Sequence, residues 1–204
     1  MPRAISLNAD AGEGEPADRA LIPLLDRVSI ACGGHAGGER SMRTAVALAA
    51  RHGVRVGAHP GYPDRARFGR VSLALPPAAV GRLVVAQSRR LAILAAVRGL
   101  RLDHVKLHGA LYHDVSRDPV LAAAVARAIR RLGQGVAWIG PPGTAQGGAA
   151  RRAGIRFLRE GFVDRRYAHD GSLVPRDRPG ALLAPRAAVR QAVRLAASRR
   201  FDTL

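Results

Sequence analysis

The amino-acid sequence predicts an α/β protein built around a parallel sheet. Short runs rich in Val, Ile and Leu alternate with longer Ala- and Arg-rich segments, in which apolar residues recur every three or four positions. Strands that alternate with helices of this length are typical of βα units. Because no linker, low-complexity segment or charge run interrupts the pattern, we expect a single domain over residues 1–204.

Six apolar runs have the length of buried strands, and four segments have the period of amphipathic helices. The strands are expected at residues 4–9, 27–32, 54–59, 102–108, 135–140 and 154–160. The helices are expected at residues 41–52, 77–98, 119–132 and 184–199. Proline opens the second and third helices, and a glycine follows each of the first three, as helix ends prefer.

The composition narrows the classes of function. Hydrophobic residues make up 48% of the 204 residues, which is enough for a sizeable core. The net charge of +18 would suit nucleic acid, but the arginines are scattered singly or in pairs through every segment. We therefore expect no nucleic-acid partner, although a positive field attracts anionic substrates.

The cysteine count and the hydropathy pattern bear on the compartment. Cys32 is the single cysteine, and no apolar stretch approaches the length of a membrane span. The start of the chain, "MPRAISLNAD", lacks the apolar region of a signal peptide. We expect a cytoplasmic protein without membrane contact.

Polar residues stand where the predicted strands end. Asp10, His35, His59 and His108 each lie at or just after the end of an apolar run. The carboxyl ends of parallel strands carry the active sites of β/α barrels and the ligand crevices of open α/β sheets. These four residues are therefore expected to meet on one face of either architecture.

Two motifs follow the first two strands. "NADAGEGE" holds Asp10, Glu13 and Glu15, whose carboxylates suit a general base or a metal ligand, or equally a helix N-terminus. The glycines of "ACGGHAGG" let the backbone approach a ligand closely. We interpret Cys32 as a small buried strand residue rather than a nucleophile, and His35 as a site candidate.

"GAHPGYPD" places His59 at the end of the third strand, with Tyr62 as a candidate ligand contact. "HVKLHGALY" contains Lys106, the only lysine in the chain, which should share a strand face with His108. A buried lysine is costly unless it meets an anion. The alternatives are a turn with a surface histidine and an edge strand with a solvated lysine.

Residues 160–181 form a long segment with little regular pattern. Loops of this length in compact domains tend to be functional, and this one offers Asp164 and Arg165 as binding groups. The alternative is a solvated cover over the sheet.

Taken together, these motifs resemble the LamB/YcsF lactam-utilisation family, the A subunit of bacterial 5-oxoprolinase. The match rests on "LNADAGEG", "IACGGHAGG", "GVRVGAHPGYPDRARFGR", "HVKLHGALY" and "FVDRRYAHDGSLVPRDRPGA". The resemblance implies a distorted, seven-stranded β/α barrel, similar to the TIM barrel and to that of polysaccharide deacetylases. It also implies ATP-dependent hydrolysis of 5-oxo-L-proline to L-glutamate, with ATP and Mg²⁺ bound in a complex with the B and C subunits.

Two sets of site residues are expected, and the resemblance, carried onto this chain, points to the first of them. The candidate catalytic residues are Asp10, Glu13, His35, His59, Lys106 and His108. The candidate substrate-binding residues are Tyr62, Arg70, Tyr112, Asp164 and Arg165.

The resemblance leaves the metal and the last strand as open expectations. Deacetylase-like barrels use an Asp-His-His metal site that Asp10, His35 and His59 could mimic, but we do not favour a required metal. The family continues into a further strand, whereas this chain stops at "FDTL" (201–204), so we expect a truncated last strand. The alternative functions are therefore a metal-dependent deacetylase-like hydrolase and a truncated, inactive scaffold subunit.

Overall fold

The computed structural model describes residues 5–197, which fall into two compact units. The sheet unit comprises Ser6–Gly140 and Thr144–Leu158. The C-terminal unit comprises Pro141–Gly143 and the described residues from Arg159 onward, together with Ile5. The expectation of a single domain stays a prediction.

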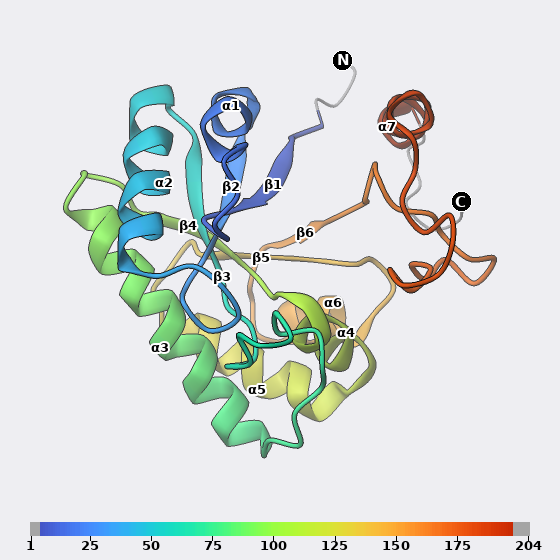
Figure 1. The fold of residues 1–204 in the computed structure, drawn as a ribbon. Coiled ribbons are helices and arrows are strands. Elements are labelled where there is room, and N and C mark those ends of the chain that lie inside the picture. Colours follow the sequence, from blue (N-terminus) through green and yellow to red (C-terminus); the bar gives the residue numbers. More distant parts are fainter. Residues whose placement is uncertain (1–4, 198–204) are drawn as a thin grey trace. The chain divides into compact units, whose positions relative to one another are not determined.

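One six-stranded sheet organises the sheet unit, and its strands follow the chain in the order β1 to β6. The strands are β1 (Asn8–Ala11), β2 (Arg27–Ala31), β3 (Arg55–His59), β4 (Leu102–Lys106), β5 (Ala137–Gly140) and β6 (Phe157–Arg159). Each neighbouring pair from β1 to β5 is parallel. The sheet is curled, and its helices lie on the outer side (Figure 1). The predicted α/β class with a parallel sheet is therefore confirmed.

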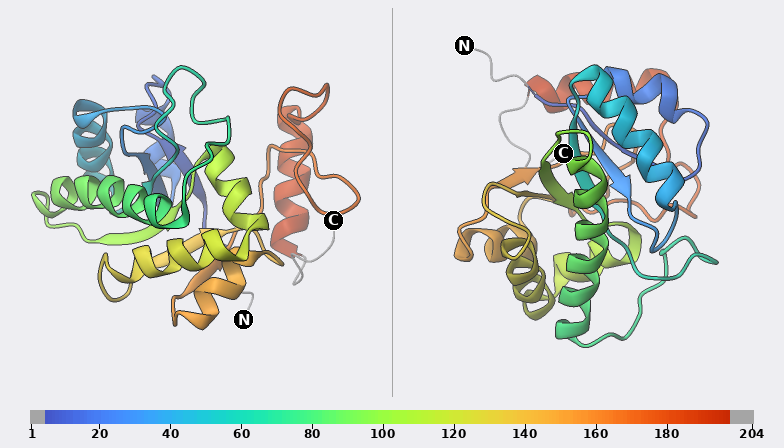
Figure 2. Two further views of the ribbon diagram at one scale, coloured as in Figure 1. Left: turned by 90° about the horizontal axis from the view of Figure 1, so that it is seen from below. Right: turned by 90° about the vertical axis from the view of Figure 1, so that its left-hand side faces the viewer.

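The helices are α1 (Asp18–Leu21), α2 (Glu39–His52), α3 (Pro77–Ala96), α4 (Gly109–Arg117), α5 (Pro119–Arg130), α6 (Ala145–Arg152) and α7 (Pro185–Ala197), with a 3₁₀ turn, η1, at Ile22–Leu24. Within the sheet unit, the helices that cover the strands pack in chain order. Helix α2 packs against α3, α3 against α5, and α5 against α6. Figures 1 and 2 both show α3 and α5 side by side. This succession of strand and outer helix is that of a β/α barrel wall.

The core of the sheet unit lies between the sheet and its own helices, of which α2, α3 and α6 contact the strands directly. Ile30, Leu91, Val125, Ile129 and Trp138 are buried there. Aliphatic and alanine side chains supply most of the packing, as the low aromatic content of 4% requires.

Helices α4 and α6 lie outside the predicted set. Helix α4 begins at Gly109, which the sequence suggests only as a turn, and Gly109 has a φ of 54°. Helix α6 contains Gly147 and Gly148, which lower helix propensity. Both helices form because their apolar residues are buried in the fold, which overrides the local preference.

Four strands have boundaries that differ from the prediction by two or more residues. Strand β5 begins at Ala137 rather than residue 135, and β6 begins at Phe157 rather than residue 154. Strand β1 begins at Asn8 rather than residue 4, because its register pairs Asn8 with Arg27 and Asp10 with Ser29. Asp10 thus lies within β1 rather than after it. Strand β4 ends at Lys106, and His108 is the extended residue that precedes α4.

The C-terminal unit contains α7 and the long segment before it. Two isolated antiparallel bridges, Arg165 with Leu182 and Tyr167 with Leu173, give this segment its folded shape. Gln191 of α7 donates from Nε2 to the carbonyl oxygens of Phe162 (2.7 Å) and Arg165 (2.8 Å).

Two expectations concern the end of the chain and the membrane. The truncated seventh strand is predicted at residues 201–204, which lie outside the described residues, so it stays a prediction. The resemblance of the barrel to that of deacetylases also stays a prediction. Within residues 5–197, no helix has both the length and the apolar character needed to cross a bilayer.

Candidate active site

The candidate site lies at the carboxyl ends of the first four strands. Asp10, His59 and Lys106 belong to β1, β3 and β4. Glu13 and His35 follow β1 and β2, and His108 follows β4. Because the paired strands run parallel, these ends open on one edge of the sheet, and the structure brings all six predicted catalytic residues together there.

Lys106 and Asp10 form the charged pair of the site. Lys106 Nζ lies 3.0 Å from Asp10 Oδ1 and 3.2 Å from Oδ2. The lysine is only 4% exposed, whereas the side chain of Asp10 is 31% exposed. Burial acts to raise the pKa of Asp10, but His59 and Lys106 outweigh it and hold the pKa at about 2. Asp10 is therefore ionised, and the buried lysine has the anion that its position requires.

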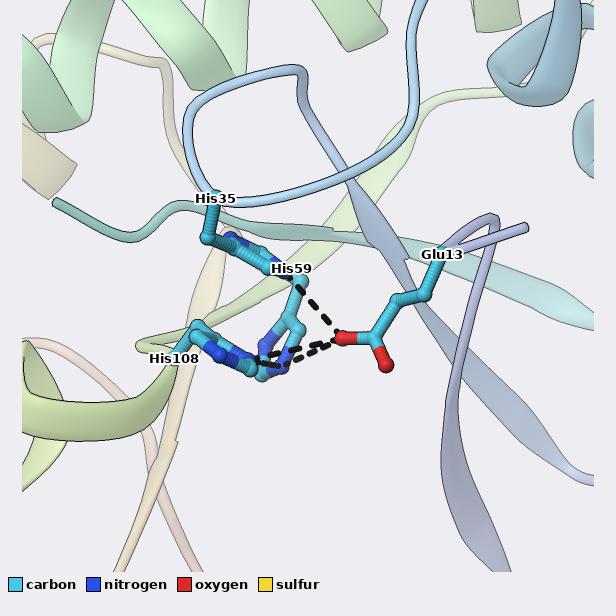
Figure 3. Close-up of side chains that lie close together, drawn as sticks. All are labelled: Glu13, His35, His59 and His108. Atoms are coloured by element: carbon cyan, nitrogen blue, oxygen red, sulfur yellow. Dashed lines mark hydrogen bonds and ion pairs between the residues drawn. The ribbon is translucent and has the colours of Figure 1, made fainter. Parts of the chain in front are cut away.

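Glu13 and three histidines form a second cluster beside this pair (Figure 3). Glu13 Oε1 lies 3.1 Å from His35 Nε2, 3.4 Å from His108 Nδ1 and 3.9 Å from His59 Nε2. All three histidines are buried, and Glu13 is partly exposed. We call these four residues the Glu–His cluster.

The rings of the Glu–His cluster are held in fixed orientations. His59 Nδ1 lies 2.8 Å from the carbonyl oxygen of Lys106, and His108 Nε2 lies 2.9 Å from that of Phe68. A carbonyl only accepts, so each of these ring nitrogens is the protonated donor. The His35 and His108 rings are stacked, with centroids 3.5 Å apart.

Burial governs the charge of two of these histidines. It lowers the pKa of His59 well below its ordinary value, although Asp10 opposes the shift. Burial and the neighbouring His35 lower the pKa of His108 to about 4. Both rings are therefore neutral at pH 7 and present lone pairs toward Glu13 and Asp10.

A buried polar network lies one layer below Lys106. His104 shares the strand face of Lys106, and its Nε2 lies 3.0 Å from Ser29 Oγ. Its Nδ1 lies 3.1 Å from Asp103 Oδ2, which also accepts from Arg27 Nε at 3.0 Å. Gly57 has no side chain where the His104 ring lies, so the ring fits across β3. Because these contacts depend on strand register, the sequence motifs do not reveal them.

The five predicted substrate-binding residues lie in different places. Tyr62 is buried, and its hydroxyl donates a hydrogen bond to Asp114 Oδ2 at 2.9 Å. This bond ties the Tyr62 side chain to α4, to which Asp114 belongs. Tyr112 is buried in α4, one turn after His108. Arg70 is exposed, and its guanidinium lies 5.0 Å from the ring centroid of Phe68.

Asp164 and Arg165 belong to the C-terminal unit. Arg165 Nη2 donates to the carbonyl oxygen of Val174 at 2.7 Å, and Arg165 pairs with Leu182 in an isolated bridge. Their role as substrate contacts stays a prediction.

Phe68 is a site residue that the sequence motifs did not single out. It adopts a φ of 55°, a left-handed conformation that costs a side-chain-bearing residue energy. Its carbonyl orients His108, and its ring packs edge-on against His35 (5.5 Å) and His108 (5.3 Å). A "Phe-Gly" pair in a loop carries no sequence signal for this conformation.

The glycine-rich loop after β2 packs closely on the loop after β1. A Cβ at Gly37 would collide with the carbonyl oxygen of Gly12, and Gly37 has a φ of 69°. Cys32 in this loop is buried, and burial raises the pKa of its thiol to about 12. Cys32 is buried as predicted, although it follows β2 rather than lying within the strand. An activated nucleophile needs the opposite pKa shift.

Comparison with known proteins agrees with this fold and with the motifs. The family model of the LamB/YcsF family matches residues 5–204. A lactam utilization protein from Thermus thermophilus superposes with a TM-score of 0.88 at 42% identity, over 95% of this chain and 81% of that chain. A proposed cellobiose-phosphate cleavage protein from Enterococcus faecalis shares the fold alone, with a TM-score of 0.50 at 12% identity over 75% of this chain and 65% of that one. The chain therefore belongs to the LamB/YcsF family.

Proposed function

We propose that this chain is the A subunit of an ATP-dependent 5-oxoprolinase, which opens the lactam ring of 5-oxo-L-proline to give L-glutamate. Family membership and the 42% identical lactam utilization protein support a role in lactam use. The observation that carries the proposal is the meeting of Asp10, Lys106 and the Glu–His cluster at one sheet edge. Such a site holds bases, a fixed cation and partly exposed carboxylates within reach of one substrate.

The chemistry explains why ATP is needed. A lactam carbonyl is a poor electrophile, and phosphorylation of its oxygen makes the ring carbon far more reactive. One water then adds to that carbon and the ring C–N bond breaks, giving an acyl phosphate and an amino group, which takes up a proton to become ammonium. A second water cleaves the acyl phosphate to the carboxylate and phosphate, so that overall ATP becomes ADP and phosphate. In the proposal, ATP and Mg²⁺ bind within the complex with the B and C subunits.

The residues of the site have different roles in this reaction. Neutral His59 and His108 present lone pairs that can accept the proton of the attacking water. Asp10, ionised and 3.4 Å from His59 Nε2, stabilises the imidazolium that results. Lys106 holds Asp10 in place and supplies positive charge for the substrate carboxylate or the phosphorylated lactam oxygen.

Reconstitution tests the proposal. The chain is co-expressed with its two partner subunits, and glutamate release from 5-oxo-L-proline is measured with and without ATP. We expect ATP-dependent release that falls by about 100-fold or more in Lys106→Ala, as loss of a transition-state charge typically does. Arg51→Ala, an exposed residue of α2, is the control. Unchanged activity in Lys106→Ala would remove Lys106 from the mechanism.

A metal-dependent hydrolase that works without ATP is the second candidate. The convergence of Glu13 with three imidazoles favours it, because this donor set is also that of a metal site. Release of glutamate, or of acetate from an acetylated amine, at the same rate with and without ATP would favour this candidate.

A further inference from the structure

We propose that the Glu–His cluster binds one divalent transition-metal ion of the zinc type. The ligands are Glu13 Oε1, His35 Nε2, His59 Nε2 and His108 Nδ1. The proposal deepens the proposed function and rests on it only for the role of the ion in ring opening. With the ion bound, His59 and His108 would be its ligands, and Asp10, which lies beside His59, would accept the proton of the attacking water in their place. The sequence left a protein-bound metal possible but not favoured, and the proposal now favours one.

The first argument is the spacing of the donor atoms. One atom from each of the four residues lies within 4.8 Å of every other. The separations from Glu13 Oε1 are 3.1, 3.4 and 3.9 Å, and His59 Nε2 lies 3.0 Å from His108 Nδ1. Bonds of about 2.0–2.1 Å place the ligands of a tetrahedral zinc ion about 3.3 Å apart. A small inward or outward movement of each side chain reaches that spacing.

The second argument is the contact between two ring nitrogens. His59 donates its Nδ1 proton to the carbonyl of Lys106, and His108 donates its Nε2 proton to the carbonyl of Phe68. In the neutral rings, the two remaining nitrogens, 3.0 Å apart, are both acceptors. Two lone pairs that face each other repel unless a proton or another cation lies between them.

Both rings are buried, so bulk water does not separate the two facing nitrogens. A metal ion supplies positive charge at the point where the lone pairs of His59 and His108 and the Glu13 carboxylate converge.

The third argument is the support behind the ligands. Histidines that bind metals usually donate their other ring nitrogen to a carbonyl or carboxylate, which His59 and His108 both do. His35 Nδ1 is buried and has no hydrogen-bond partner among the described residues, so His35 lacks this support. Its ring is instead fixed by contact, since a Cβ at Gly61 would lie 2.7 Å from His35 Nδ1.

The donor set selects the type of ion. Three imidazoles with one carboxylate suit Zn²⁺ and its neighbours in the first transition row, whereas Mg²⁺ and Ca²⁺ prefer oxygen ligands. Glu13 and the nearby Asp10 are the partly exposed members of the site, so water and substrate approach the ion from their side. A bound ion of this kind lowers the pKa of a coordinated water and polarises a carbonyl.

Binding is measured on the chain alone, so that it does not depend on the partner subunits. Chelator-treated protein is titrated with Zn²⁺ in a calorimeter, and with Co²⁺ while its visible absorption is recorded. We expect one Zn²⁺ per chain and the intense absorption bands of four-coordinate Co²⁺. Glu13→Gln and His59→Gln should each weaken binding by more than about 100-fold, beyond the loss typical of outer-shell changes. His35→Gln should cost less than His59→Gln, because His35 lacks an orienting acceptor.

The controls separate a built site from surface binding. His52→Gln and His169→Gln remove exposed histidines and should leave Zn²⁺ binding unchanged. Circular dichroism of each metal-free variant verifies folding, and Glu13→Gln, at a partly exposed position, is the variant least expected to disturb it. Equal Zn²⁺ affinity in the wild type, Glu13→Gln and His59→Gln, or no Zn²⁺ binding, would overturn the proposal.

The two proposals fail in different ways. If Zn²⁺ binds as expected but the reconstituted complex releases no glutamate, the proposed function fails and the metal site stands. If chelator-treated and Zn²⁺-loaded complexes release glutamate at the same rate, the role of the ion in ring opening fails.

Discussion

Lys106 Nζ lies 3.0 Å from Asp10 Oδ1, although 96 residues separate the two in the chain. The lysine is almost fully buried, and the aspartate lies at the more open side of the site. A compact ammonium on a flexible stem fits this position, whereas a guanidinium is larger and planar. This explains why a chain with otherwise only arginine as its strong base has a lysine here.

The size of this position gives the first prediction. Lys106→Arg keeps the charge but overpacks the pocket, and we expect it to lower the free energy of unfolding by about 1–3 kcal/mol. The control is the reverse exchange at an exposed site, Arg98→Lys, which should change the free energy of unfolding by less than about 0.5 kcal/mol. Urea denaturation measures both variants. A Lys106→Arg variant as stable as the wild type would show that the pocket does not select for lysine.

The network below the site predicts a dependence of stability on pH. Burial acts to raise the pKa of Asp103, but its hydrogen bond and charge interaction with His104 and its pairing with Arg27 outweigh this and lower the pKa from 3.8 to about 2. A lowered folded-state pKa stabilises the fold above the unfolded value, and this contribution is lost as the pH falls from about 4 to 2. Ionised Asp103 should therefore add about 2 kcal/mol to the free energy of unfolding at neutral pH.

Asp103→Asn isolates this contribution. The difference in unfolding free energy between the wild type and Asp103→Asn should be largest at pH 7 and shrink as the pH falls toward 2. Asp177→Asn, at an exposed position, is the control and should give no such trend. A difference that stays constant from pH 7 to pH 2 would contradict the account of this network.

The backbone of Phe68 gives a prediction from a matched pair of variants. Phe68→Ala and Phe68→Gly both remove the ring, but only glycine adopts a φ of 55° without penalty. We expect Phe68→Gly to be more stable than Phe68→Ala by about 1 kcal/mol. At a position with ordinary backbone angles, the alanine variant is the more stable of the two. A Phe68→Ala variant as stable as Phe68→Gly, or more stable, would therefore argue against a left-handed backbone at Phe68.

Gln191 is expected to order the long segment of the C-terminal unit. Its amide donates to the carbonyl oxygens of Phe162 and Arg165, and a carboxylate at this position cannot donate. Trypsin should therefore cleave residues 160–181 several times faster in Gln191→Glu than in the wild type. Gln134→Glu, at an exposed loop position, is the control for the added charge. Equal cleavage rates in Gln191→Glu and Gln134→Glu would show that the amide does not order the segment.

The position of the site could be predicted from the sequence because it depends on one rule. Parallel strands open their carboxyl ends on one edge, so residues at the ends of successive apolar runs must meet. This reasoning selected Asp10, His35, His59 and His108, and the strand alternation added Lys106. The family resemblance added Glu13, which the residues alone left open between a site and a helix start.

The remaining features depend on geometry that no local pattern carries. The left-handed Phe68 results from how the loop after β3 closes on His108. The Arg27–Asp103–His104 network depends on the register between strands that are distant in the chain. Helices α4 and α6 are stabilised by burial despite their glycines, so propensity did not reveal them.

The most direct test of the account is the rate of glutamate release from 5-oxo-L-proline by the three-subunit complex, with the wild-type chain and with Asp10→Asn. Asp10 joins Lys106 to His59, and its neutral amide cannot stabilise an imidazolium. We predict ATP-dependent release in the wild type and a loss of about 100-fold or more in Asp10→Asn. No ATP-dependent release from the wild-type complex, or an equal rate in the two proteins, would contradict the assignment of this site to lactam opening.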